Sequence, residues 1–367
     1  MKVKPHITFI TITLTVLAIP VITFNRKGTT AVRENRMLAA IPCLIRDGNL
    51  NGKLLPEYGT WLEDRFGGRE LLLSLNAWVT YDILRARRFN ERAIQGKRGW
   101  YFYIHKGDGD NLSDFYKQNL LTDGERADFK KRVRDTADWC TENGIKCLFL
   151  IGPNKHSVYE EFYPFERPAG PTRGDQLAAA FRELDVPLVF PRDYLISQKA
   201  AFGYPLYYET DTHWNPQGAY LAFTRLREAL TALFPAVEFP QIAYEVTVGS
   251  SMTDGDILPM LGIRKAKSTR PSLRPVKHEN SDFYTYLKNE GTQGVHTEGT
   301  DRSLPRAIVF RDSFFSALEP FTSPLFSETD YRWKRFQEED KEAIIAYHPD
   351  IIIFETVERY SFNIARP

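Results

Sequence analysis

The run Lys146-Cys147-Leu148-Phe149-Leu150-Ile151 decides the fold class of this chain. It is short and almost entirely apolar, which is typical of a strand that is buried on both faces of a sheet. A helix is predicted just before it, because Thr122 and Glu125 have the spacing of a capping box and apolar residues then recur at helical intervals. Asn143-Gly144 would end this helix. A helix followed directly by a doubly buried strand indicates an α/β sheet.

The same pairing of a helix with an apolar strand recurs along the chain. A helix is predicted over residues 175–184 with a strand over 186–190, and another over 338–347 with a strand over 351–354. One more strand is predicted over 307–310. Strands that alternate with helices predict an α/β fold with a mainly parallel sheet.

The segment from about residue 238 to about 304 breaks this regularity. Gly, Ser, Thr and Lys dominate it, and Gly255-Asp256-Ile257-Leu258-Pro259-Met260-Leu261 is a compact apolar island within it. Loops of this length inside a domain are usually functional or disordered. We therefore interpret the segment as an irregular insertion near the functional site.

Composition and charge exclude several classes of function. The 48 Lys and Arg against 47 Asp and Glu give a net charge of +1, so no electrostatic reason exists to expect nucleic acid as a partner. The three cysteines form no C-x-x-C pair, which argues against a zinc site. Cys140 and Cys147 could form a disulfide in an oxidising compartment, leaving Cys43 free. Small buried thiols are the alternative.

The amino terminus is predicted to be a signal-anchor. Lys2 and Lys4 precede an uncharged and mostly apolar stretch over residues 7–24, which is at the short end for a helix that spans a membrane. Arg26-Lys27 follows at once and no convincing cleavage site is present, so a cleaved signal peptide is the second interpretation. The free amine, Lys2 and Lys4 favour an arrangement with the bulk of the chain outside the cytoplasm, but Arg26, Lys27 and Arg33 on the other side of the stretch compete with them.

These features predict three parts of the chain. Residues 1–27 form the anchor, residues 28–60 a linker and amino-terminal extension, and residues 61–367 one α/β domain that contains the insertion at about 238–304. The length of 367 residues is sufficient for one large domain of this kind.

Two short segments carry residues suited to acyl transfer. In Tyr207-Tyr208-Glu209-Thr210-Asp211-Thr212-His213-Trp214-Asn215, an acid stands two residues before a histidine. Residues two apart lie on one face of an extended segment, so Asp211 can reach His213. Ser313 follows the predicted strand at 307–310, where a helix should begin. We predict that the three meet as a triad in which the carboxylate orients the imidazole and the imidazole takes the serine proton.

Plainer interpretations exist for each segment. Ser313, or Asp312 before it, could cap the helix that follows. Asp-x-His could be a surface pair or half a metal site, but a third and fourth ligand at suitable spacing are lacking in the sequence. We therefore predict no metal and no cofactor. The free N–H groups at the start of the helix after Ser313 could hold an oxyanion.

The quoted residues resemble a known family. Asp-Thr-His-Trp-Asn-Pro-Gln-Gly-Ala (211–219) and Arg-Asp-Ser-Phe-Phe (311–315) are similar to the alginate O-acetyltransferase AlgX/AlgJ family, as are Gly-Trp-Tyr-Phe-Tyr (99–103) and the tail at 349–359. The resemblance extends roughly over residues 40–367. It implies an SGNH-hydrolase-like, three-layer α/β/α fold, with the triad on Asp211, His213 and Ser313.

The resemblance also implies a function and partners. The expected enzyme is periplasmic, anchored to the inner membrane, and moves acetyl groups onto hydroxyls of an exported polysaccharide. A membrane-bound O-acyltransferase would supply the acetyl groups. Two departures from the family are visible: Arg311 and Asp312 replace the small residue expected before the serine, and the chain resembles the shorter members without a carbohydrate-binding module.

Five further residues are predicted to contact substrate: Tyr208, Trp214 and Trp333 by stacking on sugar rings, Asn154 as an oxyanion donor, and Arg359 as a ligand for an anionic sugar. Asn154 follows the predicted strand at 146–151, and such strand ends line the crevice of an α/β sheet, although a loop role is the alternative. Pairing of Arg359 with Glu355, at i,i+4 spacing, is the alternative for the arginine.

Three functions fit these observations. The first is a serine-dependent O-acetyltransferase acting on an alginate-like polysaccharide through an acetyl-Ser313 intermediate. The second is a carbohydrate acetylesterase, in which water replaces the sugar hydroxyl. The third is a polysaccharide-binding or scaffold subunit of an export complex, without catalysis.

Overall fold

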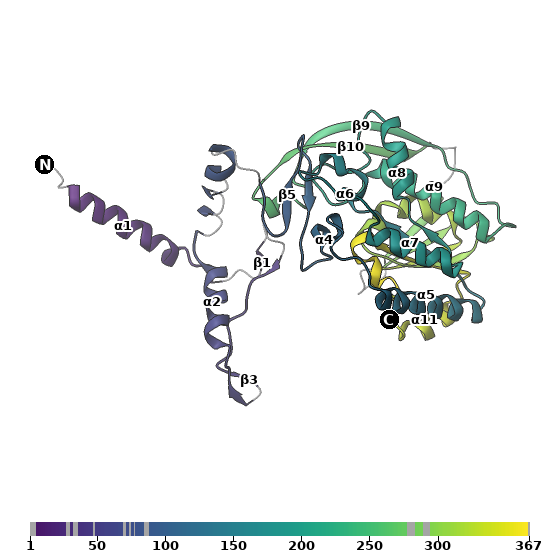
Figure 1. The fold of residues 1–367 in the computed structure, drawn as a ribbon, viewed down its shortest axis with the longest axis horizontal. Coiled ribbons are helices and arrows are strands. Elements are labelled where there is room, and N and C mark those ends of the chain that lie inside the picture. The colour runs from purple at the N-terminus through teal and green to yellow at the C-terminus, as the bar shows by residue number, and fades with distance from the viewer. Residues whose placement is uncertain are drawn as a thin grey trace. The chain divides into compact units, whose positions relative to one another are not determined.

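The computed structural model describes residues 5–26, 30–31, 36–46, 48–68, 71–72, 75–76, 78–83, 88–276, 283–288 and 294–365. Lys2, Lys4 and Lys27, which bear on the predicted membrane topology, lie outside the described residues. The chain divides into two units, residues 1–89 with 258–264 and residues 90–257 with 265–367 (Figure 1). The predicted domain boundary at residue 61 stays a prediction.

The smaller unit consists of short elements: α1 (Pro5–Ile22), β1 (Thr30–Ala31), β2 (Arg36–Met37), β3 (Ile45–Arg46), β4 (Asn49–Leu50), α2 (Leu54–Arg65), η1 (Trp78–Ile83) and η4 (Pro259–Leu261). The apolar stretch at 7–24 is thus helical over most of its length. Of the helices built from described residues, none is both long enough and apolar enough to cross a bilayer. The predicted signal-anchor is therefore not supported by the structure.

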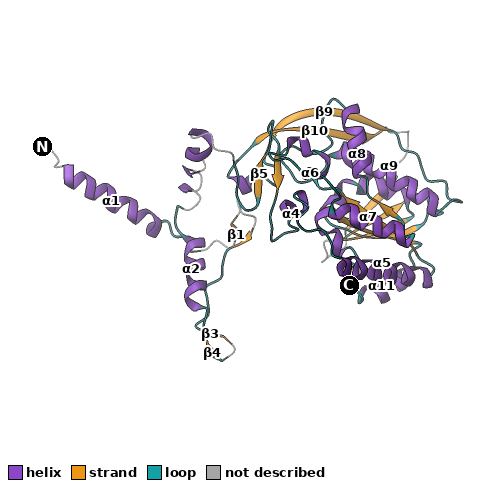
Figure 2. Cartoon of the chain, in the orientation of Figure 1, coloured by secondary structure: helices purple, strands orange, loops and turns teal. Residues whose placement is uncertain are grey.

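The larger unit contains a central sheet, helices and a long ribbon (Figure 2). Its first half comprises β5 (Ala93–Gln95), β6 (Tyr101–Tyr103), α4 (Asn111–Phe115), α5 (Asp123–Glu142), β7 (Lys146–Gly152), α6 (Lys155–Val158), η2 (Glu160–Phe162), α7 (Arg173–Leu184), β8 (Leu188–Val189), α8 (Arg192–Gln198), η3 (Lys199–Ala201) and α9 (Pro216–Leu233). Its second half comprises β9 (Tyr244–Thr253), β10 (Ala266–Pro275), β11 (Tyr284–Lys288), β12 (Val295–Gly299), β13 (Arg306–Phe310), η5 (Ser313–Ala317), α10 (Glu319–Thr322), η6 (Ser323–Leu325), β14 (Glu328–Arg332), α11 (Asp340–Tyr347), β15 (Ile351–Val357) and η7 (Glu358–Asn363).

Helix starts follow the capping chemistry of the sequence. The capping box of α5 is confirmed, since the Thr122 N–H donates to Glu125 at 2.9 Å and the Glu125 N–H donates to Thr122 Oγ1 at 3.3 Å. Helix α7 begins with a second capping box, formed by Thr172 and Asp175, that the sequence analysis did not identify. Because this box sets the start of the helix, α7 begins at Arg173, two residues before the predicted start.

The central sheet has the order β11-β12-β14-β13-β15-β7-β8. From β14 to β8 each strand is parallel to its neighbours, whereas β12 is antiparallel to both β14 and β11. The α/β prediction is confirmed, but the sheet is mixed and not simply parallel. The connections from β11 to β12 and from β12 to β13 are too short for a crossover helix, so these strands cannot follow the parallel pattern.

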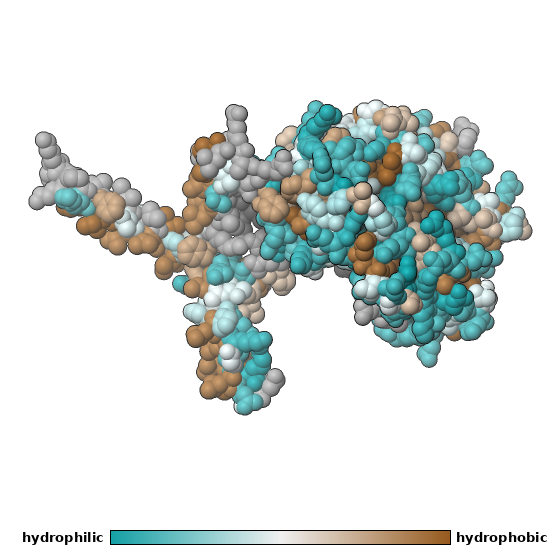
Figure 3. All heavy atoms as spheres, viewed as in Figure 1, coloured by the Kyte–Doolittle hydropathy of each residue, from teal (hydrophilic) through white to brown (hydrophobic). Residues whose placement is uncertain are grey.

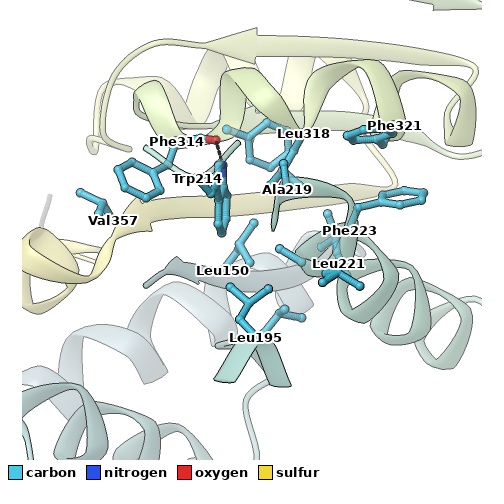
Figure 4. Packing of buried hydrophobic residues seen from close by; sticks show 14 of the residues in the cluster. Leu150, Leu195, Trp214, Ala219, Leu221, Phe223, Phe314, Leu318, Phe321 and Val357 are labelled. Atoms are coloured by element: carbon cyan, nitrogen blue, oxygen red, sulfur yellow. Dashed lines mark hydrogen bonds between the residues drawn. The ribbon is translucent and has the colours of Figure 1, made fainter. Parts of the chain in front are cut away.

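Alternate side chains of the central strands enter two separate cores. Leu150, Val309 and Ile353 pack with α8, α9 and the residues that follow Ser313, as Figure 4 shows for Leu150, Leu195 and Leu221. Ile151, Ile308 and Ile352 pack with α5, α7 and α11 on the opposite face. The sheet is thus covered on both faces, as the SGNH-like expectation requires. On the face drawn in Figure 3, the surface of this unit is mostly hydrophilic.

The insertion is more regular than predicted. Strands β9 and β10 pair along their full length from Tyr244↔Pro275 to Thr253↔Ala266, and β11 and β12 extend the central sheet. Most β9 side chains are exposed, although Tyr244, Val246 and Val248 alternate with less apolar residues, so the sequence does carry a strand signal that the interpretation as an irregular loop did not use. The three cysteines are free thiols, so the possible disulfide between Cys140 and Cys147 is not formed in this structure.

Truncating Ile353 tests the central strand. Ile353 is fully buried in β15, so Ile353→Ala should lower the free energy of unfolding by about 3 kcal/mol through lost burial and a cavity. Chemical denaturation measures this loss. Ile345→Ala in α11 is the matched control, because Ile345 is 45% exposed and its truncation should change stability by less than about 0.5 kcal/mol. Equal effects at both positions would contradict the assignment.

Candidate active site

A tight turn carries two of the predicted residues. Tyr207 and Trp214 form a short antiparallel bridge, so the chain between them reverses direction. Directly after it, the Asn215 side chain accepts hydrogen bonds from the first N–H groups of α9, at 3.0 and 3.1 Å. Asn215 is thus the N-cap of α9, and Pro216 at the first helical position suits such a start. His213 therefore lies inside the bridged turn, two residues before the N-cap of α9.

Asp211, His213 and Ser313 lie in one hydrogen-bonded chain. Nδ1 of His213 is 2.6 Å from Oδ1 of Asp211, and Nε2 is 2.8 Å from Oγ of Ser313. A carboxylate only accepts, so the Nδ1–H donates to Asp211 and Nε2 is left to accept the serine proton. The backbone N–H of His213 also donates to Oδ1 of Asp211, at 3.1 Å. The structure thus brings the three predicted residues together.

The serine lies at the start of η5, on a turn fixed by its neighbour. Oδ1 of Asp312 accepts the N–H of Phe314 at 2.8 Å, and Oδ2 accepts the N–H of Val357 at 2.7 Å. The N–H of Asp312 donates to the buried Glu355 at 2.8 Å. Asp312 is therefore the N-cap, as one alternative predicted. Ser313 has no capping role and its hydroxyl faces the imidazole.

Asp256 is a member of the site that the sequence analysis missed. It comes from the compact island of the insertion, and its Oδ1 accepts the N–H of Thr212 at 2.7 Å while its own N–H donates to Oδ2 of Asp211 at 3.2 Å. Oδ2 of Asp256 lies 3.7 Å from Nδ1 of His213. Gly255 packs so closely on the turn that a Cβ there would lie 2.2 Å from the Thr210 carbonyl oxygen.

Burial has the opposite effect to hydrogen bonding and charge on the pKa values of His213 and Asp211. Burial alone would lower the pKa of His213, but the hydrogen bond and charge of Asp211, together with the charge of Asp256, raise it above its ordinary value. Burial would raise the pKa of Asp211, but the hydrogen bond from His213 holds it well below its ordinary value. Asp211 therefore stays ionised, and His213 is a stronger base than a free histidine.

The same three groups have the residue types of a metal site. Asp211, His213 and Asp256 present ligand atoms within 4.8 Å of one another. However, the 2.6 Å between Nδ1 and Oδ1 is shorter than about 3 Å, the separation expected for two ligands each about 2 Å from one ion. The geometry fits a hydrogen bond and not a bridging metal.

Trp214 is not placed to stack on a sugar, which corrects the sequence-based prediction. Its side chain is 1% exposed, and its Nε1–H donates to the carbonyl of Phe314 at 2.9 Å (Figure 4). Apolar packing from Leu150 and Ala219 surrounds the indole. Trp214 therefore links the turn that carries His213 to the turn that carries Ser313, on the side of the hydrophobic core.

The other two aromatic candidates remain accessible to some degree. Tyr208 is half-buried, with the Arg270 guanidinium 5.2 Å from the centre of its ring. Trp333 is 44% exposed, and Arg311 lies 4.1 Å from its ring centre on one side. Their roles in stacking stay predictions.

Arg359 and Asn154 each have unused hydrogen-bonding groups. The Arg359 guanidinium lies 5.8 Å from the ring centre of Phe314 and forms no ion pair with any described residue. Its predicted pairing with Glu355 is wrong, because Glu355 belongs to strand β15 and binds Asp312 instead. Asn154 is buried, its N–H donates to Glu358 at 2.8 Å, and its side-chain amide has no partner among the described residues.

The sequence and the structure of this chain are similar to those of several known proteins. The model of a family described as "SGNH hydrolase-like domain, acetyltransferase AlgX" matches residues 93–294, which include Asp211 and His213 and end before Ser313. The chain is 28% identical over 271 residues to a probable alginate O-acetylase AlgJ of Pseudomonas putida, covering 71% of this chain and 64% of that protein. It is 24% identical to the AlgJ of Pseudomonas syringae pv. tomato, covering 58% and 51%.

This chain therefore spans between about half and two thirds of the length of these curated relatives. Among solved structures, Bacillus cereus PatB1 with a sulfonyl adduct superposes with a TM-score of 0.57 at 15% identity, covering 76% of this chain and 99% of that chain. At this identity the likeness supports the fold alone.

The titration of His213 tests the electrostatics of the site. In the wild-type protein, the imidazole followed by NMR should titrate above 6.5, its ordinary pKa. In Asp211→Asn the pKa of His213 should fall, because burial still lowers it, the hydrogen bond and charge of Asp211 are gone, and the charge of Asp256 alone raises it. Asp301→Asn, at an exposed carboxylate, is the control and should leave the titration unchanged. An unaltered titration in Asp211→Asn would sink the assigned contact.

Proposed function

Because the chain belongs to the family of the AlgX SGNH hydrolase-like acetyltransferase domain, we propose that it transfers acetyl groups to hydroxyls of an exported, alginate-like polysaccharide. The observation that carries the proposal is the hydrogen-bonded chain from Ser313 through His213 to Asp211. A serine hydroxyl is a weak nucleophile unless a base takes its proton, and this chain provides an oriented base.

The proposed reaction has two half-reactions. In the first, Oγ of Ser313 attacks the carbonyl carbon of the acetyl donor, His213 takes the serine proton, and the leaving group departs with that proton. In the second, a sugar hydroxyl attacks acetyl-Ser313, His213 takes the hydroxyl proton, and the proton returns to Oγ as the serine leaves. Asp211 stays ionised throughout and stabilises the imidazolium.

Negative charge on the carbonyl oxygen needs donors beside Ser313. The first N–H groups of a helix have no acceptor within the helix. In η5 the N–H of Phe314 is taken by Asp312, which leaves the N–H of Ser313 for the oxyanion. We propose the unpartnered amide of Asn154 as the second donor, because a buried amide without a partner is costly unless a ligand uses it.

The acceptor is proposed to meet the remaining candidates. Tyr208 and Trp333 offer ring faces for sugar stacking. Arg359, with its guanidinium free of ion pairs within the described residues, suits a carboxylate of an anionic sugar. A membrane-bound O-acyltransferase is the proposed source of the acetyl group, and the periplasm the proposed compartment; both rest on the family resemblance.

Replacing Ser313 by alanine tests the nucleophile. Turnover of a chromogenic acetyl ester should fall about a thousandfold or more, because the members of such a triad act as one unit. Ser316→Ala is the matched control, since Ser316 lies on the same helix and its hydroxyl accepts from Arg311 instead of contacting His213. Circular dichroism checks that both variants fold. Unchanged acetylation of polymer by Ser313→Ala would favour the scaffold function.

Partition of the acetyl group separates transferase from esterase. The purified protein is given a chromogenic acetyl ester with and without unacetylated oligosaccharide, and acetylated sugar is measured by mass spectrometry. We expect the acceptor to collect acetyl groups and to raise the rate at which the ester is consumed. Ester hydrolysis without any acetylated sugar would make the protein an acetylesterase.

A further inference from the structure

A buried lysine lies beneath the turn that carries Asp211. Lys155 is the first residue of α6, just beyond the end of β7, and is 5% exposed. Its Nζ donates to the carbonyl oxygens of Tyr208 at 3.1 Å, Glu209 at 3.2 Å and Asp211 at 2.6 Å. An ammonium group has three donors, so all of them are used on this one turn.

We propose that Lys155 is a positioning residue for the acetyl transfer proposed above. Its ammonium group fixes the backbone of Tyr208–Asp211 so that the Asp211 carboxylate faces Nδ1 of His213. The expected effect on turnover rests on the proposed function. The expected effect on the position of Asp211 rests on the geometry of the turn alone.

Other contacts of the turn do not replace this one. The carboxylate of Glu209 is occupied by β10, where Ser268 Oγ donates at 2.7 Å and the Thr269 N–H at 2.9 Å. The carbonyl of Glu209 also accepts the N–H of Tyr101 at 2.9 Å. The carbonyl of Asp211, by contrast, has Lys155 as its partner in the shortest of the three bonds. Lys155 therefore acts most directly on the acid itself.

The ammonium group of Lys155 is surrounded by backbone carbonyls and aromatic rings and is not paired with a carboxylate of any described residue. Its Nζ lies 5.7 Å from the ring centre of Trp100 and 5.3 Å from that of Phe102, both on the β6 side. Within the described part of the chain, every carboxylate lies beyond ion-pair distance of it. The charged groups that face it are Asp211 and Glu209 on the turn and Asp256 from the insertion. The charge is thus directed at backbone carbonyls and aromatic faces.

This environment makes the contact sensitive to pH. Burial lowers the pKa of Lys155 to about 8, against the opposing charges of Asp256, Asp211 and Glu209. Above that pH, the neutral amine keeps two donors and turns a lone pair toward the carbonyls, so the turn loosens. The unfolded chain holds this proton up to its ordinary pKa of 10.5, so between those values the group makes the fold more stable as pH rises. Deprotonation of Lys155 would therefore not itself unfold the protein in that range.

The variant Lys155→Met tests the proposal, because methionine keeps much of the side-chain volume and removes the charge and the donors. With a chromogenic acetyl ester, kcat should fall about a hundredfold, as a small misplacement of a catalytic group does, while KM changes less than about twofold. In the wild-type protein, kcat should fall as pH rises, with a midpoint near pH 8. This fall should be absent from the variant. Lys199→Met is the matched control, since Lys199 also donates to a backbone carbonyl, that of Val158, at 2.8 Å. It should keep wild-type kinetics.

A second measurement does not need turnover. The proton between His213 and Asp211 should give a low-field NMR signal, assigned by its loss in Asp211→Asn. This signal should be lost in Lys155→Met and kept in Lys199→Met. A wild-type protein that is inactive yet shows this pattern would refute the proposed function and leave the positioning role standing. A Lys155→Met protein with the wild-type signal and kcat would overturn the positioning role.

Should Lys155→Met fail to fold, the wild-type titration serves in its place, because deprotonation removes the same charge from the folded protein. The low-field signal should then weaken as pH rises through about 8, with circular dichroism unchanged. A signal that is constant up to pH 10 would contradict the proposal.

Discussion

The buried indole of Trp214 joins the two segments from which the site is built. Its Nε1–H donates to the carbonyl of Phe314 at 2.9 Å, so a residue beside His213 is bonded to a residue beside Ser313 across 100 positions of sequence. Loss of this bond would leave a buried carbonyl unpaired, at a cost of about 1–3 kcal/mol. The 2.8 Å contact between His213 and Ser313 is thus secured from the core side of the site, where water cannot compete.

Polar groups buried under both turns make the arrangement rigid. Beneath the serine, Asp312 accepts two backbone N–H groups, and Glu355 accepts the N–H of Asp312 itself. Burial, followed by the charge of Asp312, raises the pKa of Glu355 well above its ordinary value. Beneath the acid, Lys155 donates to carbonyls of the turn. Such groups are costly to bury unless each finds its partners, so a turn that satisfies them has few alternative conformations.

The parts of the fold that the sequence predicts are those with a local signal. The capping box at Thr122 and the apolar run at 146–151 identified α5 and β7, because periodicity and capping act within a few residues. The pairing of Ser313 with His213 was predictable from chemistry, since few residue types can do the work at a strand end. Lys155 and Asp256 were not, because no sequence motif marks a lysine or an acid whose partners are backbone groups of a turn, and these contacts form only in the folded chain. Trp214 was misjudged for the same reason: exposure is a property of the folded chain and not of a motif.

The carboxyl edge of the sheet explains why the order of the triad along the chain does not matter. Strand β15 lies between β13 and β7, and its end is bonded to the ends of both neighbours: the Val357 N–H donates to Asp312, and Glu358 accepts the N–H of Asn154. Parallel strands deliver their carboxyl ends to one edge whatever their sequence order. The serine after β13 and the lysine after β7 are therefore set in a common frame by β15. The triad requires only that its three members meet in the right geometry. The acid and the base can therefore come before the nucleophile in the sequence.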